Sequence, residues 1–146
     1  MPVESIFIPD IDEHPQIRSK LEKEYAHKIK VVHTNMYFSC GDAYISIFPA
    51  NPETDGNNSG LSILFQVENC DILITGDRDI AGERQLLRED IPPVEVLVAG
   101  HHGAGTSTGE ELLQRLRPSV AVISVGKNNF HLHVSQINFL SCMGLY

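Results

Sequence analysis

The sequence lacks several features that would each have assigned it to a class of proteins. No apolar run approaches the ~20 residues that a helix needs to cross a bilayer. The N-terminal stretch MPVESIFIPDIDEH has no basic start and carries early acidic residues, unlike a secretory signal. There is no internal repeat, no low-complexity segment and no GxxxxGK nucleotide-binding loop. These absences predict a cytoplasmic protein without a transmembrane segment.

Positive charge and paired cysteines are also scarce. Eleven Lys and Arg residues stand against 19 Asp and Glu residues, which gives a net charge of −8. A broad basic face that could hold a nucleic-acid backbone is therefore not supported, although a local patch is not excluded. The three cysteines form no CxxC pair, so we interpret Cys40, Cys70 and Cys142 as free thiols of a reducing compartment, buried as small hydrophobic residues.

What is present describes one globular domain. The 146 residues, 42% of them hydrophobic and 21% charged, suit a single domain over residues 1–146. Strands that first pair locally and then alternate with helices predict a layered α/β fold with a mixed sheet and flanking helices. Hydrophobic periodicity and turn residues predict strands at 3–9, 29–33, 43–49, 94–100 and 119–126, a hairpin at 61–77, and helices at 14–27, 80–89, 106–117 and 135–143.

Ionisable residues follow two of the predicted buried strands. Asp77 follows the apolar run in ILITGD, and His101 and His102 follow the apolar run in VLVAGHH. Ligands in layered α/β folds collect where strands run out into loops, and Asp and His are ligands of zinc, manganese and iron. Taken singly, an Asp after Thr-Gly is commonly a turn residue or helix cap, and adjacent histidines are usually a surface accident. Two buried strands that are each followed by an ionisable residue favour a ligand-binding site, provided that the two strands are close neighbours.

A longer series of motifs resembles a known family. NNSGLSILFQVENCDILITGD, then ER-LL, then VEVLVAGHHGAGTST, then LRPSVAVISVGKNNF and a histidine resemble the later half of the metallo-β-lactamase fold. The nearest likeness is to the hydrolase domain of DNA-uptake competence proteins of the ComEC type, and to the small stand-alone hydrolases related to it. The match runs from about residue 57 to residue 133. The resemblance implies the C-terminal half of an αββα domain that uses two metal ions, zinc above all, with manganese or iron as alternatives.

The resemblance also implies roles for individual residues. Asp77 would bridge the two metal ions, and His101 would be a terminal ligand. His102 would support a ligand or contact the substrate, so we place it among the candidate catalytic residues. Asn58 and Ser59 match the family's Asn-x-Ser entry to the hairpin, where a structural role is expected.

A third loop, SVGKNNFHLH, would line the same pocket. The resemblance assigns Asn128 and Asn129 to this lining and makes His133 the second candidate catalytic residue. Family members usually have Gly-His-Pro at this place, whereas this chain has Leu132-His133-Val134.

One feature of the family is missing. The first half of the fold should supply a His-x-His-x-Asp-His cluster, which provides most of the metal ligands, and the sequence contains none. Zinc sites generally need at least three protein ligands, and Asp77 and His101 make two. We therefore expect that the chain corresponds to the later half of the domain, and that by itself it has weak or no hydrolase activity. It would leave uncovered a sheet face or edge that the first half, or another partner chain, normally covers.

Three functional hypotheses remain. The first is part of a metal-dependent hydrolase acting on a phosphodiester or another ester. The second is a non-catalytic binding module or remnant that pairs with another chain. The third is an unrelated α/β protein with a phosphate or receiver-type site at Asp77, in which His101 would have no role.

Overall fold

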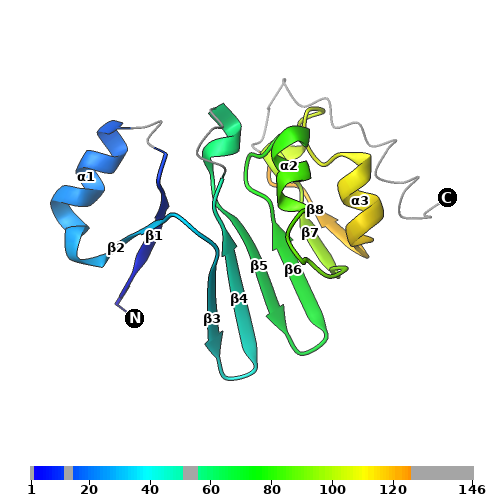
Figure 1. Ribbon diagram of the computed structural model, residues 1–146, viewed down its shortest axis with the longest axis horizontal. Coiled ribbons are helices and arrows are strands. Elements are labelled where there is room, and N and C mark those ends of the chain that lie inside the picture. Colours follow the sequence, from blue (N-terminus) through cyan, green and yellow to red (C-terminus); the bar gives the residue numbers. More distant parts are fainter. Residues whose placement is uncertain (1, 12–14, 51–55, 126–146) are drawn as a thin grey trace.

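In a computed structural model of the chain, residues 2–11, 15–50 and 56–125 are described. The main feature is a six-stranded mixed sheet with the strand order β3-β4-β5-β6-β7-β8 (Figure 1). Strands β3 to β6 pair antiparallel, and β6, β7 and β8 pair parallel. The strands are β3 (Met36–Cys40), β4 (Ala43–Phe48), β5 (Ser62–Val67), β6 (Cys70–Ile74), β7 (Val96–Val98) and β8 (Val120–Val122).

Short turns build the antiparallel part, and helical crossovers build the parallel part. Gly41 (φ 60°) and Glu68 (φ 51°) take left-handed conformations in the tight turns β3–β4 and β5–β6. Helix α2 (Ile80–Leu86) connects β6 to β7, and helix α3 (Glu110–Leu116) connects β7 to β8. Parallel neighbours need such crossovers because a hairpin cannot join them.

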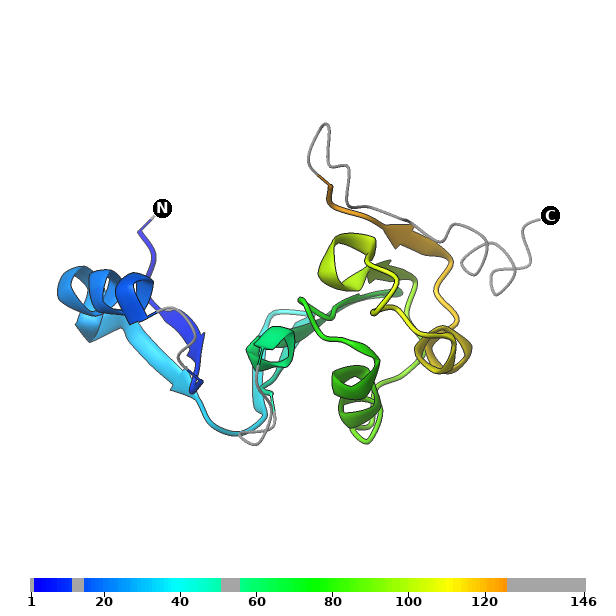
Figure 2. The same ribbon diagram turned by 90° about the horizontal axis from the view of Figure 1, so that it is seen from above.

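One face of the sheet is covered, and the core lies there. Helices α2 and α3 both lie on this covered face (Figure 2). The buried cluster joins the sheet to the helices and to the segment before β7; its buried members are Phe48, Leu64, Leu73, Leu86, Ile91, Val94, Leu97, Leu112, Leu113 and Leu116.

The opposite side, which we call the open face, consists of two register rows that cross all six strands. The first row is Phe38, Ile45, Phe65, Ile72, Val96 and Val120. The second row is Met36, Ile47, Ile63, Ile74, Val98 and Val122. Every member is apolar, yet only Ile47 is buried, and Val120 and Val122 are 50% and 45% exposed. The covered face also carries polar residues, among them Ser46, Gln66 and Asp71, so among the described residues the open face is the more uniformly apolar of the two.

The N-terminal residues form a separate small sheet. Strands β1 (Ile6–Pro9) and β2 (Ile29–Val32) pair in parallel across helix α1 (Pro15–Tyr25) and a short 3-10 turn (Ala26–Lys28). This unit stands to one side of the large sheet, at its β3 end (Figures 1 and 2). The rings of Phe7 on β1 and Phe38 on the open face lie 5.1 Å apart, so the small sheet contacts the open face at its β3 end.

The layered mixed sheet with flanking helices confirms the predicted fold class, with three differences. Strand β3 was not predicted. The segment 119–126 was expected to be a buried strand, but β8 is shorter, and Val120 and Val122 are exposed because no described residue covers the open face at its β8 end. Cys40 is exposed and Cys70 half-buried, so the expectation of buried thiols is wrong for Cys40. Cys142 and the predicted helix at 135–143 lie outside the described residues.

No helix among the described residues is both long enough and apolar enough to cross a bilayer.

Candidate metal centre at the carboxyl edge of the sheet

Three parallel strands end together at one edge of the large sheet. Ile74, Val98 and Val122 are register partners, so the turns that follow β6, β7 and β8 begin side by side. Asp77 lies three positions after Ile74, and His101 lies three positions after Val98. The two strand ends singled out in the sequence are therefore neighbours, at the place where ligands bind in such folds.

A direct contact joins these two turns. The backbone N–H of His101 donates to the carbonyl oxygen of Gly76 at 3.1 Å. Gly76 has φ 69°, and a Cβ there would lie 3.1 Å from the carbonyl oxygen of Leu61, so the tight turn requires glycine. Asp77, the next residue, is exposed. An accessible carboxylate thus stands beside the first residue of the histidine pair.

Both histidines have left-handed backbones. His101 has φ 45° and His102 has φ 55°, inside a short turn from Gly100 to Gly103. Non-glycine residues in this region cost free energy, and such residues concentrate at functional sites. The ring Nδ1 of His102 lies 2.9 Å from the carbonyl oxygen of Ser124, just past β8. Because a carbonyl only accepts, Nδ1 is the donor in this contact, and in the neutral ring Nε2 is then the acceptor or ligand atom.

The hydroxyl groups that follow the histidines form hydrogen bonds with the backbone. Ser107 Oγ donates to the carbonyl oxygen of Gly100 at 2.7 Å, and Thr108 Oγ1 accepts from the N–H of Gly100 at 3.0 Å. Helix α3 begins at Glu110, later than the predicted start at 106. The N-cap is Gly109, which has no side-chain cap, because both hydroxyls are used to close the loop after β7.

A buried carboxylate holds the same loop from the other side. Glu83 on α2 is 2% exposed and accepts from the backbone N–H groups of Thr108 and Gly109, the second at 2.8 Å. Burial raises the pKa of Glu83, and the two N–H donors act in the opposite direction. Sequence reasoning missed this role, because a Glu in an amphipathic helix usually faces solvent.

Arg78, directly after Asp77, is the other buried charge. Its side chain is 1% exposed, and its Nε donates to Ser62 Oγ at 2.6 Å. Its Nη2 donates to the carbonyl oxygens of Phe48 and Pro49 at 3.2 and 2.9 Å. Ser62 Oγ in turn donates to the carbonyl oxygen of Thr75 at 2.9 Å. This network ties the turn that carries Asp77 to the ends of β4 and β5.

Burial lowers the pKa of the Arg78 guanidinium. Nothing in the sequence signalled this position, since a charged residue in a loop is ordinarily exposed.

Asp79 completes the fixing of the turn. Its side chain caps α2 by accepting from the N–H groups of Ala81 and Gly82, both at 2.9 Å. Its own N–H donates to Asn58 Oδ1 at 3.1 Å. The expected structural role of Asn58 is therefore observed, and Asp77 is the residue of this turn whose side chain is left facing solvent.

The donor chemistry fits part of a metal site. A carboxylate and an imidazole from adjacent turns are suitable ligands, but the described residues contain no group of three or more His, Cys, Asp or Glu side chains that could hold a metal ion. Asp77 and His101 are thus brought to one edge without a third ligand among the described residues. Asn128, Asn129 and His133 lie outside the described residues.

The fold agrees with that of known structures. A mutant of CmlA beta-hydroxylase has a TM-score of 0.52 at 16% identity, over 84% of this chain and 31% of that chain. The layered mixed sheet with flanking helices therefore defines an α/β domain that shares the fold of this structure. A Thermotoga maritima protein described as a Zn-dependent hydrolase of the metallo-beta-lactamase superfamily is also matched, with a TM-score of 0.44 at 16% identity over 77% of this chain and 59% of that chain.

The sequence comparisons confirm the resemblance to ComEC-type competence proteins. The chain is 40% identical over 82 residues, 55% of its length, to ComE operon protein 3 of Bacillus subtilis. It is 40% identical over 82 residues to Recombination protein 2 of Haemophilus influenzae, and 32% identical over 84 residues to Competence protein ComA of Neisseria gonorrhoeae. The matches cover 10%, 10% and 12% of these proteins, so the chain spans about a tenth of the curated relatives it matches. No family model matches the sequence.

Proposed function

We propose that this chain contributes Asp77 and His101 to the metal centre of a hydrolase that cleaves a phosphodiester or another ester. The observation that carries the proposal is the hydrogen bond of 3.1 Å from the His101 N–H to the Gly76 carbonyl, which joins the two ligand-bearing turns at one edge. The rigid anchoring of both turns by Arg78, Asp79 and Glu83 supports it further, because metal ligands need fixed positions.

Each residue has a distinct task in this proposal. Asp77 can bridge two cations, because a carboxylate has two oxygens and a negative charge. His101 is a neutral terminal ligand. His102, whose Nδ1 is held by Ser124, presents Nε2 to the substrate. A pair of bound divalent cations would lower the pKa of a water molecule and stabilise the negative charge that develops on the substrate. The role of His133 at the substrate stays a prediction from the sequence.

The metal centre needs further ligands from another polypeptide segment. Two ligands hold a divalent cation weakly, and a closed or catalytic zinc site has at least three. We therefore expect weak zinc binding and little or no turnover from this chain alone. The competence and recombination names of the relatives make a nucleic-acid phosphodiester one candidate substrate. The net charge of −8 does not favour a broad nucleic-acid surface on this chain.

Zinc titration by calorimetry tests the proposal. The chain is measured alone and after co-expression with the segment of Bacillus subtilis ComE operon protein 3 that precedes the matched 82 residues. The pair should bind zinc tightly and cleave a chromogenic phosphodiester. Asp77→Asn and His101→Ala should each weaken zinc binding by more than about 100-fold. His33→Ala is the matched control, because His33 is 63% exposed and pairs only with Asp10 among its described contacts.

Zinc affinity that His101→Ala leaves unchanged would contradict the proposal. It would also leave open the third hypothesis, a phosphate site at Asp77 without a role for His101.

A non-catalytic binding module is the second candidate function. The observation that favours it is that the described residues hold no cluster of three potential metal ligands. On this alternative the chain would form a complex with the partner segment, but zinc would bind no more tightly to the complex than to the separate chains, and no ester would be cleaved. The same titration therefore separates the two functions.

A further inference from the structure

A pocket lies between the segment that leads into β3 and the end of helix α2. It has a volume of about 550 Å³ and is lined by residues 33–35 before β3, by residues 48–50 at the end of β4, and by Arg78 and the end of α2. Neither Asp77 nor His101 is among the described residues that line it. Pockets that bind small organic molecules have volumes of roughly 300–1,000 Å³, so this one is large enough to hold such a ligand.

Arg78 brings a buried positive charge to the wall of this pocket. Its Nε donates to Ser62 Oγ, and its Nη2 donates to the carbonyl oxygens of Phe48 and Pro49. A guanidinium has five N–H groups, so the two on Nη1 are left without a hydrogen bond to any described residue. The described residues also include no carboxylate paired with Arg78. Because buried charges are ordinarily paired, Arg78 lacks a counter-charge within this part of the chain.

An amide without a partner lines the same pocket. Gln85 lies on α2, and its Oε1 atom is buried with no hydrogen-bond partner among the described residues. A buried polar atom in this state costs free energy, and a ligand that carries a hydrogen-bond donor would remove the cost. The pocket therefore offers both unused donors, on Arg78, and an unused acceptor.

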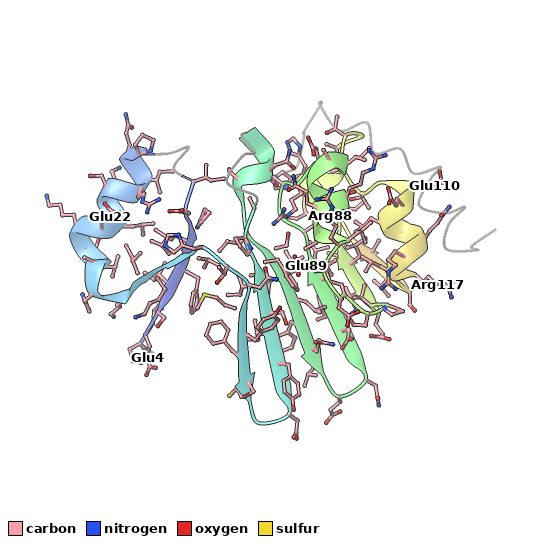
Figure 3. All side chains as sticks on the ribbon, in the orientation of Figure 1. Glu4, Glu22, Arg88, Glu89, Glu110 and Arg117 are labelled. Carbon is pink, nitrogen blue, oxygen red and sulfur yellow. The ribbon has the colours of Figure 1, made fainter. Side chains whose placement is uncertain are left out.

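The rest of the lining adds a second positive charge and an apolar wall. Arg88 is exposed and directly follows α2 beside Glu89, and both are labelled in Figure 3. The carboxylate of Glu89 is already engaged, because it accepts from Asn35 Nδ2 at 2.7 Å. Phe48 and Leu86 supply the apolar part of the lining. With two guanidinium groups and one engaged carboxylate, the pocket favours a ligand that is negatively charged at one end and apolar at the other.

We propose that this pocket binds a small organic anion, a carboxylate or a phosphate with an apolar body. Its oxygens would accept from Arg78 Nη1 and from Arg88, and would supply the counter-charge that Arg78 lacks. A donor group of the ligand would bind Gln85 Oε1, and its apolar body would pack against Phe48 and Leu86. Since the ligand binds the folded chain, an occupied pocket would also raise the midpoint of thermal unfolding.

Calorimetry with the full chain in EDTA tests this inference without any contribution from a metal centre. The probes share a phenyl ring: benzoate and phenyl phosphate are the anions, and benzamide is the neutral control. At least one anion should bind saturably and more tightly than benzamide, and the tighter anion identifies the preferred acidic group. No binding of either anion, or equal affinity for benzamide, would overturn the inference.

Two substitutions in the lining locate the site. Arg88→Gln and Gln85→Met should each weaken binding of the tighter anion roughly fivefold, because each removes a hydrogen bond to the ligand. Gln85→Met should leave the free chain as stable as before, since the Oε1 atom has no partner to lose. Arg84→Gln is the matched control, because Arg84 is exposed, pairs with Glu111 and does not line this pocket. Equal losses from Arg84→Gln and Arg88→Gln would overturn the inference, since they would reveal a general effect of charge.

The part played by Arg78 is followed in the unsubstituted chain, because replacement of a buried, hydrogen-bonded charge destabilises the fold. In heteronuclear NMR spectra, titration with the tighter anion should shift the side-chain Nε–H signal of Arg78 and the amide signals of 33–35 and 85–89. Shifts confined to 76–77 and 100–103 would place the anion at the edge that carries Asp77 and His101, and would overturn the inference. Zinc affinity does not enter these measurements, so the inference stands or falls separately from the proposed function.

Discussion

Arg78 carries its charge in a place that water does not reach. Its guanidinium donates to the Ser62 hydroxyl and to the carbonyl oxygens of Phe48 and Pro49, all neutral acceptors. A buried charge costs free energy unless hydrogen bonds compensate it, so these contacts hold the side chain in one position. The consequence is that Asp77, one residue earlier, lies on a turn with little freedom to move.

Replacing Arg78 should therefore cost far more than replacing an exposed arginine. Arg78→Met leaves three acceptors without their donor, two of them in fully buried contacts, and we expect the free energy of unfolding to fall by roughly 3–5 kcal/mol. Arg84→Met is the control, because Arg84 pairs with Glu111 on the surface and both side chains are more than 60% exposed; its effect should stay within about 0.5 kcal/mol. Urea unfolding measures both, and equal effects would contradict the proposed anchoring.

At the residue scale, the sequence indicated the candidate metal ligands but not the buried residues that fix the turns on which those candidates lie. Asp77 and His101 were found because each follows a buried apolar run, a pattern that the chain order alone reveals. Arg78 and Glu83 could not be found in the same way, because their burial depends on contacts with residues distant in sequence, such as Ser62 and Thr108.

Helix α2 is the element that links the turns carrying Asp77 and His101. It begins at the Asp79 cap, directly after the turn of Asp77, and it carries Glu83, which holds the loop after His101. A seven-residue helix has little intrinsic stability, so its ends and its buried face must be fixed by tertiary contacts. Both carboxylates therefore give this element a measurable dependence on pH.

The Asp79 cap should lose its contribution in acid. Hydrogen bonds to the ionised carboxylate, first that from Gly82, lower the pKa of Asp79 below its usual 3.8. The cap therefore stabilises the fold fully above pH 3.8 and loses its contribution as the pH falls through the lower folded-state pKa. Asp79→Ala should cost about 1 kcal/mol at neutral pH and less in acid. Asp79→Asn, which keeps the cap without a titrating group, should remove this pH dependence in urea unfolding; an unchanged dependence would disprove the assignment.

Glu83 should show the opposite dependence. Burial raises its pKa above 4.5, so the folded state favours the protonated form. Stability from this group is present below pH 4.5 and is lost as the pH rises through the folded-state pKa. The unfolding free energy of Glu83→Gln should therefore improve relative to the native chain as the pH rises from 4 to 7. Glu111→Gln, at an exposed position of α3, is the control variant. A constant difference across this range would contradict the assignment.

Elements were predicted in type more accurately than in extent. The hairpin at 61–77 and the helices at 14–27 and 80–89 are present, because turn residues and apolar periodicity act within each segment. Strand β3 was missed although Gly41 supplies a turn signal before β4, since its five residues are weakly apolar and depend on pairing with β4. The start of α3 was misplaced because the hydroxyls of Ser107 and Thr108 bind the Gly100 backbone.

The whole molecule consists of two parts with unequal packing. The large sheet and helices α2 and α3 share a buried core, whereas helix α1 of the N-terminal unit has no buried residue. Besides the chain itself, the contacts between the parts include the Phe7–Phe38 ring pair and a hydrogen bond of 2.7 Å from Asn35 to Glu89, the latter labelled in Figure 3. A two-stranded sheet is marginally stable alone, so this unit depends on few contacts.

Native-state hydrogen exchange should therefore separate the two parts. Amides of β1 and β2 should open at a lower free energy than those of β5 and β6, because Val32 is the one buried residue among the described residues of this unit. Phe7→Ala should lower protection in the N-terminal unit alone. Leu73→Ala, at a fully buried position of β6, should lower the global stability by about 2–5 kcal/mol. A single cooperative opening of both sheets would contradict this expectation, because it would show that the small sheet is held as firmly as the large one.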